Sequence, residues 1–220
     1  PDVKFILLDG TPQDGTYTEF KLNENVYSVF YAEEQAGFLA GYAAVKEGYT
    51  KLGFMGGMAV PAVVRFGYGF VQGAEYAAGE MGITGLDVKY NYTGDFKATP
   101  EVHSKAAPWY QGGTEVIFAC GGAVGNSVMA AAEASSGKVI GVDIDQSAES
   151  ATVITSAMKM LGQSVYDAIA AYYADSFPGG VKYTLGADGD GVGLPMENRK
   201  FEVLTPADYD SIEAKTATGE

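Results

Sequence analysis

The residues of this chain that are suited to chemistry stand where short apolar runs end. The stretch KVIGVDIDQS, residues 138–147, carries Asp143 and Asp145 directly after a run typical of a buried strand. Other apolar runs end in a similar way, on acids, a glycine pair, an aromatic ring or a lysine. The groups at these ends are Asp9, Phe96, Gly121, Gly122, Asp143 and Lys159. Because ligands bind outside the carboxyl ends of the strands in open parallel sheets, these groups are our candidates for a binding site.

Together these groups suit a polar, neutral ligand that carries a ring. Carboxylates accept hydrogen bonds from hydroxyl groups, and an aromatic side chain such as Phe96 stacks on a flat ring. A glycine pair such as Gly121-Gly122 lets the backbone approach closely, and Lys159 adds a hydrogen-bond donor. A sugar or a nucleoside fits this description.

Each of these residues also has a different interpretation, and the alternatives stay open at this stage. An aspartate after a strand often caps a helix or forms a turn, and Asp145, followed by Gln146 and Ser147, favours a turn. Phe96 is equally suited to the core. The pair Asp143 and Asp145 also matches the D-x-D motif of Mg²⁺-dependent phosphatases of the haloacid dehalogenase type. In those enzymes, however, the motif follows the first strand, whereas here it ends a late one.

We expect no cofactor, no metal centre and no enzymatic activity. A single cysteine, Cys120, excludes an intrachain disulfide and a cysteine-based metal cluster, and the single His103 excludes a histidine-rich zinc site. The glycines that begin at Gly121 resemble a phosphate-binding loop but lack the Lys-Ser/Thr of a P-loop, and neither GxGxxG nor Gly-x-Ser-x-Gly occurs. Cys120 is expected to be a small buried hydrophobe, and His103 a solvated residue on a polar helix.

The charge of the chain argues against several classes of partner. Its 220 residues contain 14 lysines and arginines against 28 acids, for a net charge of −14. Such a surface repels nucleic acid and anionic lipid, and it disfavours a highly phosphorylated ligand. The apolar runs are too short and too often interrupted to span a bilayer. The chain begins at Pro1 rather than at a methionine, which we interpret as the mark of a processed, trimmed or excised polypeptide.

Apolar runs alternate with amphipathic stretches along most of the chain. This alternation indicates βαβ units and an α/β fold with a parallel sheet covered on both faces. We expect strands at 2–10, 25–32, 51–57, 86–96, 115–122, 138–145 and 152–159, with short ones within 182–195 and 200–205. We expect helices at 33–48, 61–81, 100–112, 126–134, 161–177 and 206–215.

Several longer segments closely resemble the basic membrane protein (BMP) family. They are YAEEQAGFLAGYAA, KLGFMGGMAVPAVVRFGYGFVQGAEYA, VIFACGGAVGNSV, VIGVDIDQS and VITSAMK. They occur in the family's order and cover most of residues 1–170. Members are lipoproteins that serve as substrate-binding components of ABC transporters, among them the receptors for purine nucleosides. The resemblance implies a periplasmic-binding-protein fold of type I, whose two lobes close on a nucleoside.

The resemblance also implies roles for individual residues. Asp9 corresponds to the aspartate of the first lobe that contacts the sugar, and Phe96 to an aromatic residue that stacks on the base. Asp143 corresponds to the acceptor of ribose hydroxyls, and Lys159 to the donor. Two further contacts are implied: one through the backbone of Gly121 or Gly122, and one at Phe66, which is ligand-facing in sugar-binding relatives.

Nothing in this chain corresponds to the first part of the family's sequences. We therefore expect residues 1–48 to be the end of the first lobe, 49–157 the second lobe, and 158–220 the segment shared between the lobes. A first lobe without its opening strands predicts an exposed apolar edge and self-association. The expected partners are a nucleoside and an ABC permease, with the protein held outside the cytoplasm by an anchor not in this chain. Binding or sensing of a sugar or another furanose in the same fold is the alternative.

Overall fold

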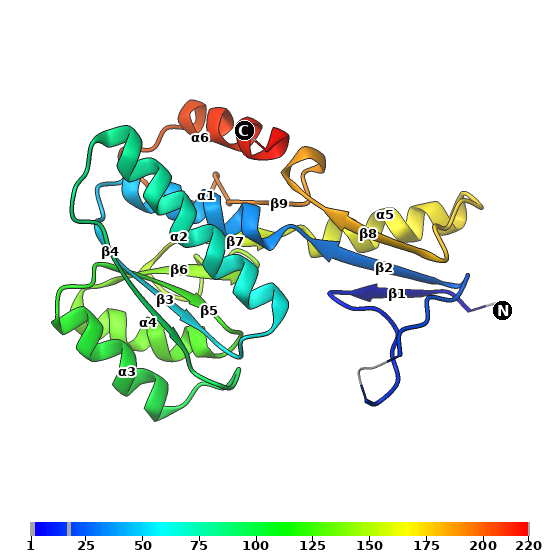
Figure 1. Cartoon of the computed structure of the whole chain (residues 1–220), viewed down its shortest axis with the longest axis horizontal. Coiled ribbons are helices and arrows are strands. Elements are labelled where there is room, and N and C mark those ends of the chain that lie inside the picture. The colour runs from blue at the N-terminus through cyan, green and yellow to red at the C-terminus, as the bar shows by residue number, and fades with distance from the viewer. Residues whose placement is uncertain (1–2, 17–18, 220) are drawn as a thin grey trace.

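The computed structural model describes residues 3–16 and 19–219 and contains two β-sheets flanked by helices (Figure 1). The three-stranded sheet has the order β1-β2-β8, with β1 at Phe5–Leu8, β2 at Val26–Tyr31 and β8 at Val181–Leu185. The six-stranded sheet has the order β4-β3-β5-β6-β7-β9. Its strands are β3 (Lys51–Gly56), β4 (Asp87–Tyr92), β5 (Val116–Cys120), β6 (Lys138–Asp143), β7 (Val153–Lys159) and β9 (Val192–Gly193). All neighbouring strands are parallel except β7 and β9, so the expected α/β class is confirmed.

Helices cover both faces of the six-stranded sheet. The helices are α1 (Glu33–Lys46), α2 (Pro61–Met81), α3 (Pro100–Gln111), α4 (Val124–Ser135), α5 (Leu161–Tyr173) and α6 (Pro206–Thr218), with a 3₁₀ turn at Ala187–Gly189. Along β5, Phe118 and Cys120 belong to the core shared with α1 and α2, whereas Ile117 and Ala119 belong to the core shared with α3 and α4. Successive side chains of β5 point to opposite faces of the sheet, and both faces are buried. This explains why the sequence of the strand is a continuous apolar run.

The chain passes between the two sheets three times. It leaves the small sheet after β2 and enters the large one through α1; it returns after β7 through α5, and crosses again from β8 to β9. In Figure 1 the small sheet and α5 lie to the right and the large sheet to the left, and the carboxyl ends of their strands face each other. The division into segments 1–48, 49–157 and 158–220 stays a prediction; the strand expected over 2–10 begins outside the described residues.

Four glycines bring α1 and α2 into direct backbone contact. A Cβ atom at Gly37 or Gly41 would lie 2.1 or 2.0 Å from a carbonyl oxygen of α2, and one at Gly69 or Gly73 would lie 1.9 Å from a carbonyl oxygen of α1. No side chain fits at these positions, so the two helices are held at a fixed spacing. We call these four residues the glycine seam.

Most of the expected elements are found, and one is wrong. Helix α2 begins at Pro61 and ends at Met81 as expected, because proline suits the first helical position and Gly82 closes the helix at φ 66°. The strand expected over 200–205 does not form. The carboxylate of Glu47 instead accepts hydrogen bonds from the backbone nitrogens of Glu202 and Val203, at 2.9 and 2.8 Å, so a side chain occupies donors that a neighbouring strand would need. None of the described helices is long and apolar enough to cross a membrane.

Candidate functional site

A cavity of about 420 Å³ lies where the two sheets meet. All seven residues expected to contact ligand line it: Asp9, Phe66, Phe96, Gly121, Gly122, Asp143 and Lys159. They come from the small sheet, from the large sheet and from the start of α2. The remaining lining residues are Phe30, Val60, Pro61, Ala62, Val63, Arg65, Cys120 and Val142. The fold thus brings the predicted residues together; whether they bind a ligand stays a prediction.

Asp9 and Asp143 enter the cavity in the same unusual way. Each stands at the carboxyl end of a strand, Asp9 just after β1 and Asp143 as the last residue of β6. Each has a positive φ, 56° and 65°, in the left-handed region that few residues other than glycine adopt. Their side chains are 39% and 44% exposed. Strained backbone of this kind is concentrated at functional sites, and here it presents both carboxylates to the cavity.

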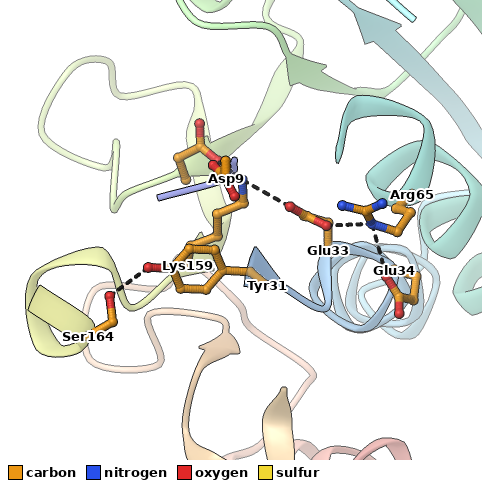
Figure 2. A network of polar contacts seen from close by, with 8 residues as sticks. Asp9, Tyr31, Glu33, Glu34, Arg65, Lys159 and Ser164 are labelled. Atoms are coloured by element: carbon orange, nitrogen blue, oxygen red, sulfur yellow. Dashed lines mark hydrogen bonds and ion pairs between the residues drawn. The ribbon is translucent and has the colours of Figure 1, made fainter. Parts of the chain in front are cut away.

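Lys159 stands at the centre of the acidic groups (Figure 2). Its ammonium nitrogen lies 2.8 Å from Asp9 Oδ2 and 3.4 Å from Asp143 Oδ1. A third carboxylate, Glu33, places Oε1 3.2 Å away. The Lys159 side chain is only 3% exposed, and the rings of Tyr31 and Phe66 lie 5.6 and 5.4 Å from its ammonium group. The lysine is therefore a buried cation that holds acids from both sheets together.

The pKa values of this cluster follow from burial and charge. Burial alone would lower the pKa of Lys159, but Asp143, Asp9 and Glu33 outweigh it and raise that pKa above its ordinary value. For Asp143, burial raises the pKa and the nearby Asp9 and Glu33 add to the rise, while Lys159 opposes it. Lys159 therefore stays charged at neutral pH, and Asp143 takes up a proton at a higher pH than an ordinary aspartate.

Sequence reasoning did not identify two further members of this cluster. Glu33, the first residue of α1, has a fully buried side chain, and its Oε2 accepts a hydrogen bond from Arg65 Nε at 2.6 Å (Figure 2). Arg65 lies near the start of α2 and also faces Glu34, whose Oε2 is 3.6 Å from the same nitrogen. In sequence, both acids match the ordinary preference for negative charge in the first turn of a helix, so no signal set Glu33 apart.

The two predicted aromatic residues occupy different environments. Phe66 is 1% exposed and packs edge-on against Phe118, with ring centroids 5.8 Å apart, so its ring forms part of the core beneath the cavity. Phe96 is half-buried and lies directly over Gly57, where a Cβ atom would come within 2.5 Å of the ring. Of the two, Phe96 is better placed to stack on a ligand.

Asp145 serves the turn after β6, as the sequence predicts. Its Oδ1 accepts a hydrogen bond from the Ser147 backbone nitrogen at 2.9 Å, and its Oδ2 one from Asn198 Nδ2 at 2.8 Å. Gln146 completes the turn, since its Oε1 accepts a hydrogen bond from the Val142 nitrogen at 2.9 Å. The two acids of the D-x-D motif therefore have separate partners, Asp143 at Lys159 and Asp145 in the turn.

The remaining candidates add little chemistry to the site. Cys120 is buried, as expected, and burial raises the pKa of its thiol well above the ordinary value, so the thiolate is disfavoured. His103 lies half-buried on α3, away from the cavity lining. Within the described residues, no group of three or more histidine, cysteine, aspartate and glutamate side chains is suited to hold a metal ion.

Comparison with known proteins places the chain among substrate-binding proteins. The family described as PnrA-like ABC transporter substrate-binding protein (Bmp) matches residues 1–218. The ABC transporter nucleoside-binding protein BmpA of Lactococcus lactis is 31% identical over 98% of this chain. Basic membrane protein D of Borreliella burgdorferi is 34% identical over 85% of it. The chain spans 64% and 55% of the lengths of these two relatives.

A solved structure shows the same architecture. An ABC transporter solute-binding protein from Conexibacter woesei superimposes with a TM-score of 0.76 at 25% sequence identity. The superposition covers all of this chain and 70% of that protein. The cavity between the two sheets therefore lies in a fold that is used to bind solutes.

Proposed function

The chain belongs to the family of PnrA-like ABC transporter substrate-binding proteins, as its sequence motifs predict, and we propose that it binds a nucleoside in the cavity between its sheets. The nucleoside-binding protein BmpA of Lactococcus lactis supports a nucleoside as the ligand. We propose a purine nucleoside as the first candidate, because the family that the sequence motifs resemble includes receptors for purine nucleosides. The whole protein would deliver its ligand to an ABC permease. It would act outside the cytoplasm as a lipoprotein, and as a binding protein rather than an enzyme.

The arrangement of Asp9 and Asp143 around Lys159 is the observation that carries this proposal. Two half-exposed carboxylates from different sheets face one cavity, and a buried ammonium group keeps them in place. Vicinal hydroxyl groups of a ribose would donate to these carboxylates. Each charge-assisted hydrogen bond of this kind contributes roughly 1.5–3 kcal/mol. The ring of Phe96 would then stack on the base.

The charge of the cavity favours a neutral ligand. Its two cations, Lys159 and Arg65, are matched by the carboxylates of Asp9 and Asp143 together with Glu33 and Glu34 behind them. A phosphate group would meet more negative than positive charge there. We therefore propose that the ligand is a nucleoside and not a nucleotide.

Titration calorimetry on the full-length protein tests this proposal. Adenosine and guanosine should bind far more tightly than ribose; equal affinity for ribose would replace the nucleoside with a sugar. The variant Asp143→Asn should lose affinity by about tenfold or more, whereas Asp145→Asn, the matched control in the turn, should bind as the wild type does. A phosphoester hydrolysis that needs Mg²⁺ and disappears in Asp143→Asn would instead establish the phosphatase.

A further inference from the structure

Lys159 is already paired within the protein, by a hydrogen bond to Asp9 and by ion pairs with Glu33 and Asp143. An ammonium group has three N–H donors. The nitrogen of Lys159 has three carboxylate partners, at 2.8 Å on Asp9, 3.2 Å on Glu33 and 3.4 Å on Asp143. With 3% of the side chain exposed, Lys159 has little capacity left to donate to a ligand.

A ligand with hydroxyl groups needs donors as well as acceptors. Each hydroxyl has one hydrogen and two lone pairs, so a hydroxyl that donates to Asp9 or Asp143 still presents acceptor sites. If these stayed unpaired in the closed cavity, each would cost roughly 1–3 kcal/mol. The protein must therefore supply N–H or O–H groups from elsewhere on the cavity wall.

Arg65 lines the cavity and has N–H groups that no described residue engages. Its side chain lines the cavity and is 38% exposed. Only its Nε is engaged, in the hydrogen bond to Glu33 at 2.6 Å. The described residues offer its two terminal nitrogens no hydrogen-bond acceptor, and these nitrogens carry four N–H groups.

Glu33 fixes the guanidinium group in this position. Its carboxylate has no exposed surface and divides its oxygens between the two cations, Oε1 toward Lys159 and Oε2 toward Arg65. The glycine seam holds the start of α1, which carries Glu33, against the start of α2, which carries Arg65, because a Cβ atom at Gly69 would lie 1.9 Å from the Glu34 carbonyl oxygen. Arg65 is thus pre-oriented before a ligand arrives, which reduces the entropy lost on binding.

We propose that Arg65, positioned by Glu33, is a ligand-binding residue that donates hydrogen bonds from its terminal nitrogens to sugar hydroxyl oxygens. We expect Arg65 to contact the sugar rather than the base. Glu33 bridges Arg65 to Lys159, so both cations lie at the same end of the cavity as Asp9 and Asp143. This inference rests on the proposed nucleoside-binding function. It deepens that function by naming the donor that complements the two acids.

Calorimetry with adenosine and guanosine on the full-length protein tests the inference. Arg65→Met should weaken binding of both nucleosides by about tenfold or more, and to the same extent, because the sugar is common to both. Arg65→Lys retains a cation beside Glu33 but lacks the forked terminal nitrogens, so it should also weaken binding while the unfolding temperature stays close to that of the wild type. Lys105→Met is the matched control, since it removes an exposed positive charge that lies outside the cavity.

Two outcomes would overturn the inference, and they are distinguishable. If the wild type binds nucleosides and both Arg65 variants bind them equally well, Arg65 is a structural residue only. If the wild type itself binds no nucleoside, the proposed function fails, and this inference fails with it.

Discussion

Replacement of Gly41 by alanine should destabilise the protein, although alanine is the better helix former. Gly41 lies within α1, where the exchange would by itself stabilise the helix by up to about 1 kcal/mol. The new Cβ atom, however, would lie 2.0 Å from the carbonyl oxygen of Phe70 and 2.9 Å from the nitrogen of Ala74, both in the backbone of α2. Backbone atoms cannot rotate away as a side chain does, so the two helices must separate.

The magnitude follows from the balance of these two effects. Forcing an extra carbon into a well-packed interior costs typically about 1–3 kcal/mol and sometimes more. With two backbone clashes at one position, we expect the upper part of this range and a net loss of about 2 kcal/mol in the free energy of unfolding. For a chain of this length such a loss lowers the unfolding temperature by roughly 4–8 °C.

Gly79→Ala is the matched control, and thermal unfolding is the assay. Gly79 lies in the last turns of α2, and a Cβ atom there would have no neighbour within 4 Å. This variant should keep or slightly raise the unfolding temperature. If Gly41→Ala proved as stable as Gly79→Ala, α1 and α2 would not be in backbone contact, and the argument that the glycine seam positions Glu33 and Arg65 would be refuted.

Two further predictions concern pH and association. Because burial raises the pKa of Asp143, this residue loses its charge at a higher pH than an ordinary aspartate. Nucleoside affinity should therefore fall as the pH is lowered into the acidic range, and calorimetry should show this fall in the wild type but not in Asp143→Asn. The free energy of unfolding should respond to Asp143 in the opposite direction to the affinity. The folded state binds the proton of Asp143 more tightly than the unfolded state does, so this group stabilises the fold more as the pH falls. The chain on its own should form dimers or larger assemblies in light scattering, because Phe5 on β1 and Tyr172 and Tyr173 on α5 are 54%, 46% and 82% exposed; a clean monomer would contradict this.

Local rules sufficed for most of the fold and for the acids of the candidate site. Strand ends in a parallel sheet point to one edge, so the rule that located Asp9, Asp143 and Lys159 needed only the positions where apolar runs stop. The two ends of α2 could also be predicted from the local sequence, because Pro61 and Gly82 mark them independently of the tertiary contacts of the helix.

What sequence reasoning missed depends on contacts between distant segments. Glu33 and Arg65 are 32 positions apart, and only the close packing of α1 on α2 brings them together. In the same way, the segment 200–205 has strand composition, but Glu47, more than 150 positions earlier, occupies its backbone donors. Lys159 and Arg65 are likewise far apart in the sequence, and only folding brings both to the carboxylate of Glu33.

A structure of the full-length protein with adenosine bound would show directly whether Asp9, Asp143 and Arg65 hold the sugar. We expect the nucleoside in the cavity between the two sheets, with its ribose hydroxyls within hydrogen-bond distance of Asp9 and Asp143. The terminal nitrogens of Arg65 should donate to hydroxyl oxygens, and the base should lie against Phe96. A nucleoside bound elsewhere, or bound there with its sugar directed away from both aspartates, would contradict this expectation.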